Sequence, residues 1–420
     1  MTTSPVLPLE PRRARADRSA DRWITVAAIA AAAGYLVLGA LSALLPSEVR
    51  LGAWLPIHLA LAGATLTAIA GVMPFFTAAL AAAPPAPRGL RAAVILLVAG
   101  GVGLVAIGRP AGLAGLAVVG GLAAVVGLVG LFAAAFLPLR QSLATSRPFI
   151  WAAYGAAIVE VAIGISLAVA DLAGERQAVA DWGLLKPAHA WLNVLGFVSL
   201  VIAATLVHFL PTIAGTRIVR RRPLDVALVA LAAGPALGAA GFAFAADLIV
   251  RIGALALLVG AGGLVLGVIG IVRDHGRWTT DLGWHRFTLG SLVGAVCWFV
   301  VGSLGAGVPA LVYGASPTAW NLALVIGPVT IGWAAQAIVG SATHLLPAVG
   351  PGDMLAHRRL RAALGSGSEL RLAALNAGAA LVTVGMVTGA SAVVAAGLAL
   401  ALAAVLGVIG LALAALRSEP

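Results

Sequence analysis

The apolar stretch from Leu184 to Ile213 holds two of the residues most able to do chemistry in this sequence, His189 and His208. The stretch is long enough to cross a bilayer, which takes roughly 20 residues. Polar side chains inside a membrane span are costly, so they usually face a protein interior and serve a function there. The two histidines lie roughly 28 Å apart along a helix that rises about 1.5 Å per residue, so we expect one near each face of the membrane.

A third histidine, His58, lies at the same predicted depth as His189, about one helical turn from the outer end of its own apolar run. Neutral imidazole is a good ligand for copper and for haem iron. We therefore expect His58 and His189 to coordinate one b-type haem, or else a copper ion, with Trp54 and Trp191 at its edge. Iron held by two imidazoles suits electron transfer rather than oxygen chemistry. The alternative is that both are interfacial histidines hydrogen-bonded to nearby backbone carbonyls.

Two further histidines, His208 and His344, share a depth at the inner side, each three residues before a proline. They form a second candidate metal pair. The alternative is that each caps the carbonyls at a helix end, where the helix dipole also favours a positive charge. The remaining three histidines fall in arginine-rich inner loops, where we expect them to be solvated: His275, His285 and His357.

Glu160 lies in the middle of an apolar run, where a carboxylate has to be paired or protonated. We expect it to face the protein interior, because lipid offers it no hydrogen-bonding partner. Its role is either a proton relay or a structural carboxyl. Asn193, Gln336 and Asn376 are polar residues of other spans, and their simplest role is to link helices through hydrogen bonds.

The composition indicates an integral membrane protein. Of 420 residues, 61% are hydrophobic and only 10% are charged, which no soluble globular protein of this size shows. The net charge of +11 does not indicate nucleic-acid binding, because the basic residues lie in short loops between apolar runs, where membrane topology accounts for them. The single cysteine, Cys297, excludes a disulfide or an iron–sulfur cluster within one chain.

Twelve apolar runs are long enough to cross a bilayer and lack the alternation of membrane strands. The predicted fold is therefore all-α, a polytopic membrane protein of about twelve transmembrane helices. The predicted spans are 23–45, 54–80, 90–108, 111–139, 150–173, 184–213, 224–246, 247–272, 284–311, 319–347, 370–391 and 392–416. We expect no extramembrane domain, since the longest loop covers only 348–369.

The basic residues predict the orientation. With the N-terminus inside, 21 of the 26 Lys and Arg residues fall in inner segments and 5 in outer ones, a strong positive-inside signal. We therefore expect both termini to be cytoplasmic, the loop 174–183 to be outside, and the protein to lie in the cell membrane. Residues 1–22 are expected to form a disordered basic cytoplasmic tail, followed by a single transmembrane domain, 23–417.

Spans 2, 6 and 10 share a pattern that predicts three pseudo-repeats of four spans, 23–139, 150–272 and 284–416. Each runs from outside to inside, with an aromatic or histidine residue near its outer end, a glycine one to two turns later and a proline near its inner end. The residues are Trp54, His58, Gly63 and Pro74 in span 2, His189, Trp191, Gly196 and Pro211 in span 6, and Trp320, Gly327 and Pro347 in span 10. We expect these three spans to face the interior of the bundle.

Twelve spans in three groups of four resemble subunit I of the haem-copper oxidases and nitric oxide reductases. A closer resemblance is to an actinobacterial membrane module that occurs alone or fused to copper nitrite reductase or multicopper oxidase domains. That family has the patterns HLxLxG, HAxLNxLGxV and, in span 10, Q followed by LLPxV. The matching segments here begin at His58, His189 and Gln336, and the stretch from Leu370 to Gly378 is similar to the eleventh span of the module.

The sequence departs from the oxidases at positions that their chemistry needs. The oxidases hold a low-spin haem between histidines of spans 2 and 10, and a second haem with copper through further histidines of spans 6, 7 and 10. Here the outer half of span 10 has Trp320 and Asn321 but no histidine, and span 7 has none. Oxygen reduction at a full binuclear centre is therefore not expected. Any copper protein or electron carrier would be an external partner.

Three functions compete on this sequence. The first is a redox or metal-handling membrane protein that binds haem b or copper. The second is a secondary transporter, because twelve spans are common among transporters, although no matching pair of broken helices marks the two halves. The third is a cofactor-free relative that acts in assembly or partner binding. The residues assign no reaction to the protein.

Overall fold

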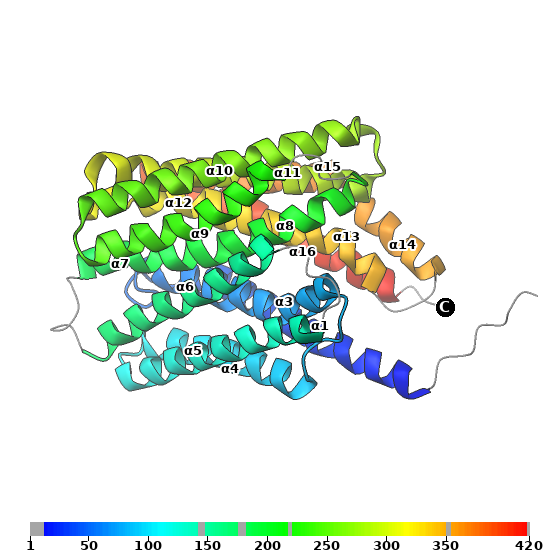
Figure 1. Cartoon of the computed structure of the whole chain (residues 1–420), viewed down its shortest axis with the longest axis horizontal. Coiled ribbons are helices and arrows are strands. Elements are labelled where there is room, and N and C mark those ends of the chain that lie inside the picture. The colour runs from blue at the N-terminus through cyan, green and yellow to red at the C-terminus, as the bar shows by residue number, and fades with distance from the viewer. Residues whose placement is uncertain (1–11, 142–147, 175–181, 217–220, 350–353, 418–420) are drawn as a thin grey trace, which may run out of the picture. The chain divides into compact units, whose positions relative to one another are not determined.

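The computed structural model describes residues 12–141, 148–174, 182–216, 221–349 and 354–417 (Figure 1), and the regular elements in these ranges are all helices. Twelve of them, counted over the described residues, are long and apolar enough to cross a membrane. Their bounds lie within a few residues of the predicted spans, from Trp23–Ser42 to Ser391–Ala415. The fold prediction is therefore confirmed, and the chain is an all-α, multi-pass membrane protein.

The chain divides into two compact units, Met1–Ser146 and Arg147–Pro420. The first unit contains α1 (Arg12–Ser42), a second span built from α2 (Trp54–His58), η1 (Leu59–Thr65) and α3 (Leu66–Ala81), then α4 (Arg88–Gly108), α5 (Ala114–Phe136) and the short η2 (Leu137–Gln141). Helix α1 packs on the second span, and α4 lies along α5.

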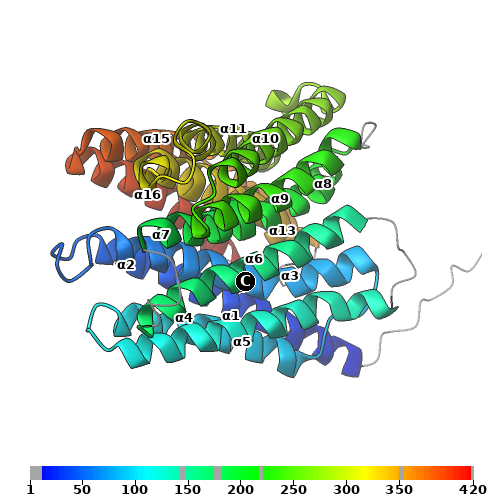
Figure 2. The ribbon, with the colours of Figure 1, turned by 60° about the vertical axis from the view of Figure 1, so that its left-hand side comes forward.

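The second unit contains the other eight spans. They are α6 (Pro148–Leu172); α7 (Trp182–Ala190), η3 (Trp191–Val198) and α8 (Ser199–Ile213); α9 (Arg222–Ala243); α10 (Asp247–His275); α11 (Gly283–Tyr313); α12 (Leu322–Ile326), η6 (Gly327–Ala335) and α13 (Gln336–Val349); α15 (Ser368–Thr388); and α16 (Ser391–Arg417). Two 3₁₀ turns, η4 (Trp278–Thr280) and η5 (Pro317–Ala319), precede α11 and α12. Helix α9 lies along α10 and α15 along α16 (Figure 2).

Two segments differ from the prediction. Helix α1 begins at Arg12, within the predicted disordered tail, because Ala and Arg are strong helix formers and the chain runs on into an apolar span. Residues 1–11 lie outside the described residues. The predicted loop 348–369 contains a further helix, α14 (Met354–Gly365), which buries Leu360 and Leu364, four residues apart on one face, and packs on α11, α13 and α16.

A π-helical segment interrupts spans 2, 6 and 10, and no other span among the described residues contains one. These are the three spans that the sequence pattern singled out. They are also the most buried of the twelve, with 56%, 83% and 67% of the residues in their most apolar windows buried. Because π-helical turns often occur at functional sites, this feature draws attention to the same three spans as the histidines do.

In each π segment, one glycine leaves room for a large side chain from the first span of its predicted group. Gly63 lies against Tyr35, Gly196 against Glu160, and Gly332 against Trp298. In span 10 the glycine is thus Gly332 rather than the predicted Gly327, which lies against Thr383 of α15. This local correspondence agrees with the predicted grouping, whereas an oxidase-like arrangement of the groups stays a prediction.

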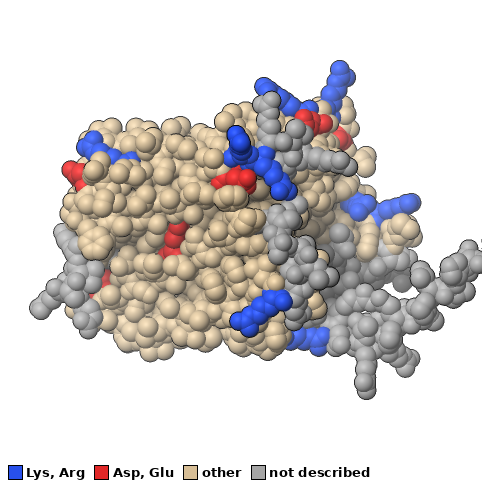
Figure 3. All heavy atoms as spheres, viewed as in Figure 1, with Lys and Arg blue, Asp and Glu red and all other residues tan. Residues whose placement is uncertain are grey.

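Charged side chains are sparse along the helices. Figure 3 shows a face formed mostly by uncharged residues, with the Lys and Arg side chains toward its ends and one acidic group visible part-way along it. Such a surface is suited to contact with lipid, because a charge at the centre of a bilayer is costly. Which face of the membrane each end lies on stays a prediction.

The helix pairs are held by close contacts between small residues. In the first unit, Gly101 of α4 meets the backbone of α5: a Cβ at this position would lie 2.5 Å from the carbonyl oxygen of Gly120 and 2.8 Å from the amide nitrogen of Ala124. Such an approach depends on glycine, as is typical where membrane helices pack through small residues.

We expect Gly101→Ala to destabilise the protein by about 1–3 kcal/mol, because the new methyl group would force two backbones apart. The neighbouring Gly100 is the matched control, since a Cβ there meets nothing within 4 Å. Thermal unfolding in detergent, followed by tryptophan fluorescence, should show a lower Tm for Gly101→Ala and an unchanged or slightly higher Tm for Gly100→Ala. Equal Tm values for the two variants would contradict the α4–α5 contact.

Candidate functional site

His189 is held against α6 by a hydrogen bond. It lies in the last turn of α7, two residues before η3, and its Nδ1 is 2.8 Å from the carbonyl oxygen of Gly164. A carbonyl only accepts hydrogen bonds, so Nδ1 carries the proton and donates it. Nε2 then carries the lone pair of the neutral ring. A histidine that binds a metal is usually prepared in this way.

Asn193, one helical turn after His189, contacts this histidine. Its Nδ2 donates to the carbonyl oxygen of His189 at 2.7 Å and lies 3.1 Å from the Nδ1 of the same residue, whose proton points to Gly164. Gly164 permits the approach, because a Cβ there would lie 2.7 Å from Asn193 Nδ2. Asn193 thus packs against the neighbouring helix but donates its hydrogen bond within its own span.

Glu160 is the next polar side chain along α6, one turn from Gly164. It is 4% exposed, as expected for a residue that faces the interior, and its carboxyl group lies directly against Gly196 of η3. Neither carboxyl oxygen has a hydrogen-bond partner among the described residues. Burying a charge without a partner is very costly, so we expect the group to hold a proton.

A second polar contact joins α6 to the same span further on. The hydroxyl groups of Tyr154 and Thr205 are 2.9 Å apart, and Tyr154 is fully buried. Polar groups therefore occur at three successive places along the contact of α6 with span 6, in the order His189, Glu160 and Tyr154.

His58 of the first unit also meets a backbone carbonyl through Nδ1, but the carbonyl belongs to its own helix. It is the last residue of α2, directly before η1, and its Nδ1 lies 2.8 Å from the carbonyl oxygen of Trp54. The indole of Trp54 stacks on the imidazole, with 4.2 Å between ring centroids. Nδ1 is again the donor, and Nε2 again carries the lone pair.

His58 and His189 thus both lie just before a π segment and share the same tautomer. A hydrogen bond to a backbone carbonyl is what we expected if these histidines bind no metal. A metal-binding histidine makes the same hydrogen bond through its second ring nitrogen. The two residues belong to different units, each described by itself. That they bind one and the same group stays a prediction.

The expected place of Trp191, at the edge of a bound group, is not supported. Its ring is fully buried and packs into α9 against Gly238 and Phe242, with 5.8 Å between the centroids of Trp191 and Phe242. Trp191 is therefore a core residue of the second unit. The sequence could not reveal this, because it does not show which face of span 6 meets α9.

Two further polar residues from the sequence analysis, Asn376 and Gln336, lie on α15 and α13. Trp298 Nε1 donates to Asn376 Oδ1 at 2.8 Å and so links α11 to α15, the role expected of Asn376. Gln336 is fully buried, and its amide atoms have no hydrogen-bond partner among the described residues. Its Nε2 would lie 2.6 Å from a Cβ at Gly294 of α11.

His344 lies among aromatic rings at the end of α13. Its ring centroid is 5.7 Å from those of Trp284 and Phe209 and 6.3 Å from that of His285. Its Nδ1 is buried and has no hydrogen-bond partner among the described residues. His208 precedes Phe209 on α8, and the predicted metal pairing of His208 with His344 stays a prediction.

The expectation that His275 and His285 are solvated is wrong. Their side chains are only 18% and 17% exposed, and both rings contact the carboxylate of Asp281. The cause is the end of α8, whose last carbonyls have no partner within the helix and attract ring N–H donors. Sequence analysis missed Asp281, although the spacing of Asp281 and His285, four residues apart, was a usable signal.

Asp281 lies outside the membrane-spanning segments. Partial burial raises the pKa of its carboxyl group, but the close contacts with the rings of His285 and His275 outweigh burial and hold the pKa below its usual value.

The helices define a polytopic membrane protein with polar side chains inside its spans. Compared with models of known protein families and with curated proteins, the sequence matches none. The resemblance to oxidase subunit I therefore depends on its short motifs and stays a prediction.

We expect Glu160→Gln to fold normally and Glu160→Lys to lose expression and several kcal/mol of stability, because an unpaired charge would be enclosed between α6 and η3. The measurement is the yield of monodisperse protein together with its Tm in detergent. A Lys variant as abundant and as stable as the wild type would show that position 160 is not enclosed.

Proposed function

We propose that this protein is a membrane redox or metal-handling protein related to the haem-copper oxidases, and that His58 and His189 bind haem b or copper. The supporting observation is that the two histidines have the same tautomer, with the proton on Nδ1. Each lies just before a π segment and donates its Nδ1 proton to a backbone carbonyl, so that Nε2 carries the lone pair of the neutral ring. This is the preparation that a ligand histidine needs.

The donor set fits the proposed groups. Neutral imidazole nitrogens suit haem iron and copper, whereas hard cations such as Mg²⁺ and Ca²⁺ prefer oxygen ligands. A haem or copper bound here would carry one electron at a time. The chain's own residues would orient the ligands: Gly164 and Asn193 fix the ring of His189, and the indole of Trp54 fixes that of His58.

Glu160 supplies the second part of the proposal. A group that gains or loses an electron changes its charge, and in an apolar interior a nearby proton can compensate that change. Glu160 lies one turn along α6 from Gly164, which holds His189, and is buried against Gly196 of η3. We assign it the role of holding or releasing that proton. An external copper protein or another electron carrier would exchange electrons with the bound group.

A second candidate function is proton-coupled transport. It is favoured by Glu160, which is buried in its span and has no hydrogen-bonding partner in the part of the chain that the structure describes. Such intramembrane carboxyl groups usually mark an ion or proton pathway. A transporter would contain neither haem nor copper, and Glu160→Gln would abolish its transport. The redox proposal instead expects a bound group that remains in Glu160→Gln.

The test is the haem and copper content of single variants. We expect His58→Ala and His189→Ala each to lose most of the bound haem or copper while keeping their size-exclusion profile and most of their thermal stability. His357→Ala is the control, because this histidine lies on α14, far along the chain from both spans. Unchanged haem and copper content in both variants would overturn the proposal.

A further inference from the structure

Three side chains that could bind a metal converge where α10 ends and α11 begins. They meet the end of α8, whereas His189 lies before η3, near the other end of the same span. They are His275, the last residue of α10; Asp281, in the connecting loop; and His285, in the first turn of α11. One ligand atom from each lies within 4.8 Å of the others. Asp281 Oδ2 is 3.0 Å from His275 Nε2 and 2.7 Å from His285 Nδ1.

The far nitrogen of each ring is already engaged with a backbone carbonyl. His275 Nδ1 lies 2.7 Å from the carbonyl oxygen of Ala214, and His285 Nε2 lies 3.0 Å from that of Ile213. Since carbonyls only accept, both far nitrogens carry protons. In the neutral rings, the nitrogens that face Asp281 therefore carry lone pairs.

Two imidazole lone pairs and a carboxylate oxygen thus point at one small region, and they repel one another unless a cation lies between them. With the carboxylate ionised, protons could fill this role only if both rings were doubly protonated, a state in which two cationic rings with centroids 5.9 Å apart share one carboxylate. A single metal ion satisfies all three lone pairs while both rings stay neutral.

We propose that His275 Nε2, Asp281 Oδ2 and His285 Nδ1 bind a divalent transition-metal ion, with Zn²⁺ the best match to two nitrogens and one oxygen. Zinc binds such ligands at about 2.0–2.2 Å, and three protein ligands leave a fourth position for water. The present separations of 2.7 and 3.0 Å need only a small opening to reach the roughly 3.3 Å edge of a tetrahedron with such bonds.

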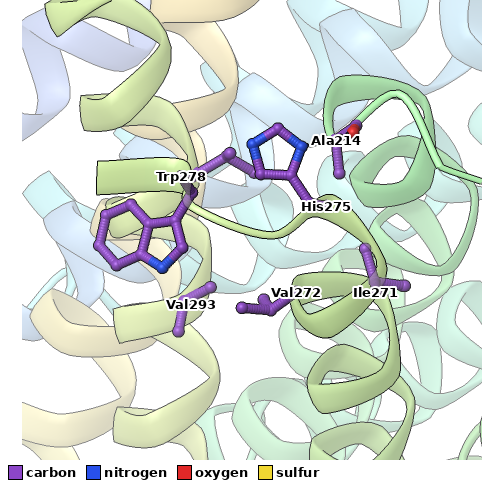
Figure 4. Close-up of a pocket in the computed structure, with 7 residues that line it drawn as sticks. Ala214, Ile271, Val272, His275, Trp278 and Val293 are labelled. Atoms are coloured by element: carbon purple, nitrogen blue, oxygen red, sulfur yellow. Dashed lines mark hydrogen bonds between the residues drawn. The ribbon is translucent and has the colours of Figure 1, made fainter. Parts of the chain in front are cut away.

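A small pocket lies beside His275, bordered by Ala214 at the end of α8 and by Trp278 of η4 (Figure 4). Its free space is about 10 Å³, close to that of one water molecule. Neither Asp281 nor His285 lines this pocket, so the three ligand atoms meet outside it. The three side chains are 17–21% exposed, which leaves a route for an ion to enter.

The carbonyl bonds give the site its structural role. Ile213 and Ala214 end α8, the inner part of the span that also carries His189. An ion held by His275, Asp281 and His285 would fasten the ends of α8, α10 and the start of α11 to one another. Metal-binding histidines normally make such second bonds to backbone carbonyls, and here two of them come from the same helix end.

The test uses full-length protein in detergent, purified without a polyhistidine tag, stripped with EDTA and dialysed against Zn²⁺. We expect one equivalent of Zn²⁺ per chain, an increase in Tm of several degrees, and at least a tenfold weaker affinity in His275→Gln, Asp281→Asn and His285→Gln. His357→Gln is the matched control and should bind as the wild type does. The Asn and Gln variants keep the size and polarity of the native side chains, so they are expected to fold.

The same experiment separates this site from the haem or copper site proposed above. His58→Ala and His189→Ala should keep the bound Zn²⁺, whatever happens to their haem or copper. The proposal is overturned if the wild type binds no Zn²⁺ above the level of the triple variant His275→Gln/Asp281→Asn/His285→Gln, or if the Zn²⁺ is lost in His58→Ala and His189→Ala instead.

Discussion

The close packing of α6 against η3 is the contact on which the candidate site depends. Two glycines make it possible: Gly164 admits Asn193, and Gly196 admits the carboxyl group of Glu160. Because the helices approach so closely, the carbonyl of Gly164 reaches the ring of His189 and fixes its tautomer. A side chain at either glycine would separate the helices, and the histidine and the carboxyl group would lose the surroundings that give them a role.

The transmembrane fold was largely predictable because the bilayer restricts it strongly. A chain in lipid has to satisfy its backbone hydrogen bonds internally, so each long apolar run becomes a helix, and run length gives its bounds. That argument fails outside the membrane, where α14 was taken for a loop. It also fails within a span, since hydropathy does not distinguish a π turn from an α turn. The π segments of spans 2, 6 and 10 were therefore not predicted, although the glycines in them were noticed.

The candidate site was predictable in its residues but not in its contacts. His189, Asn193 and Glu160 attract attention because polar groups are costly in a membrane. The partner of each depends on which faces of the helices meet, which one sequence does not show. For that reason Trp191 was placed beside a cofactor instead of in the core with α9. The cluster around Asp281 was missed for the opposite reason, because its residues lie in and directly beside a polar loop, where histidines and carboxylates are ordinary.

The central claim is that the spans of this protein hold a redox-active group. An absorption spectrum of the full-length protein, purified in detergent from cells supplied with haem precursor and copper, tests it most directly, together with haem and copper analysis of the same sample. The account predicts either the spectrum of a low-spin haem with two imidazole ligands, which changes on reduction, or about one copper ion per chain. A colourless, folded protein with neither haem nor copper would contradict it.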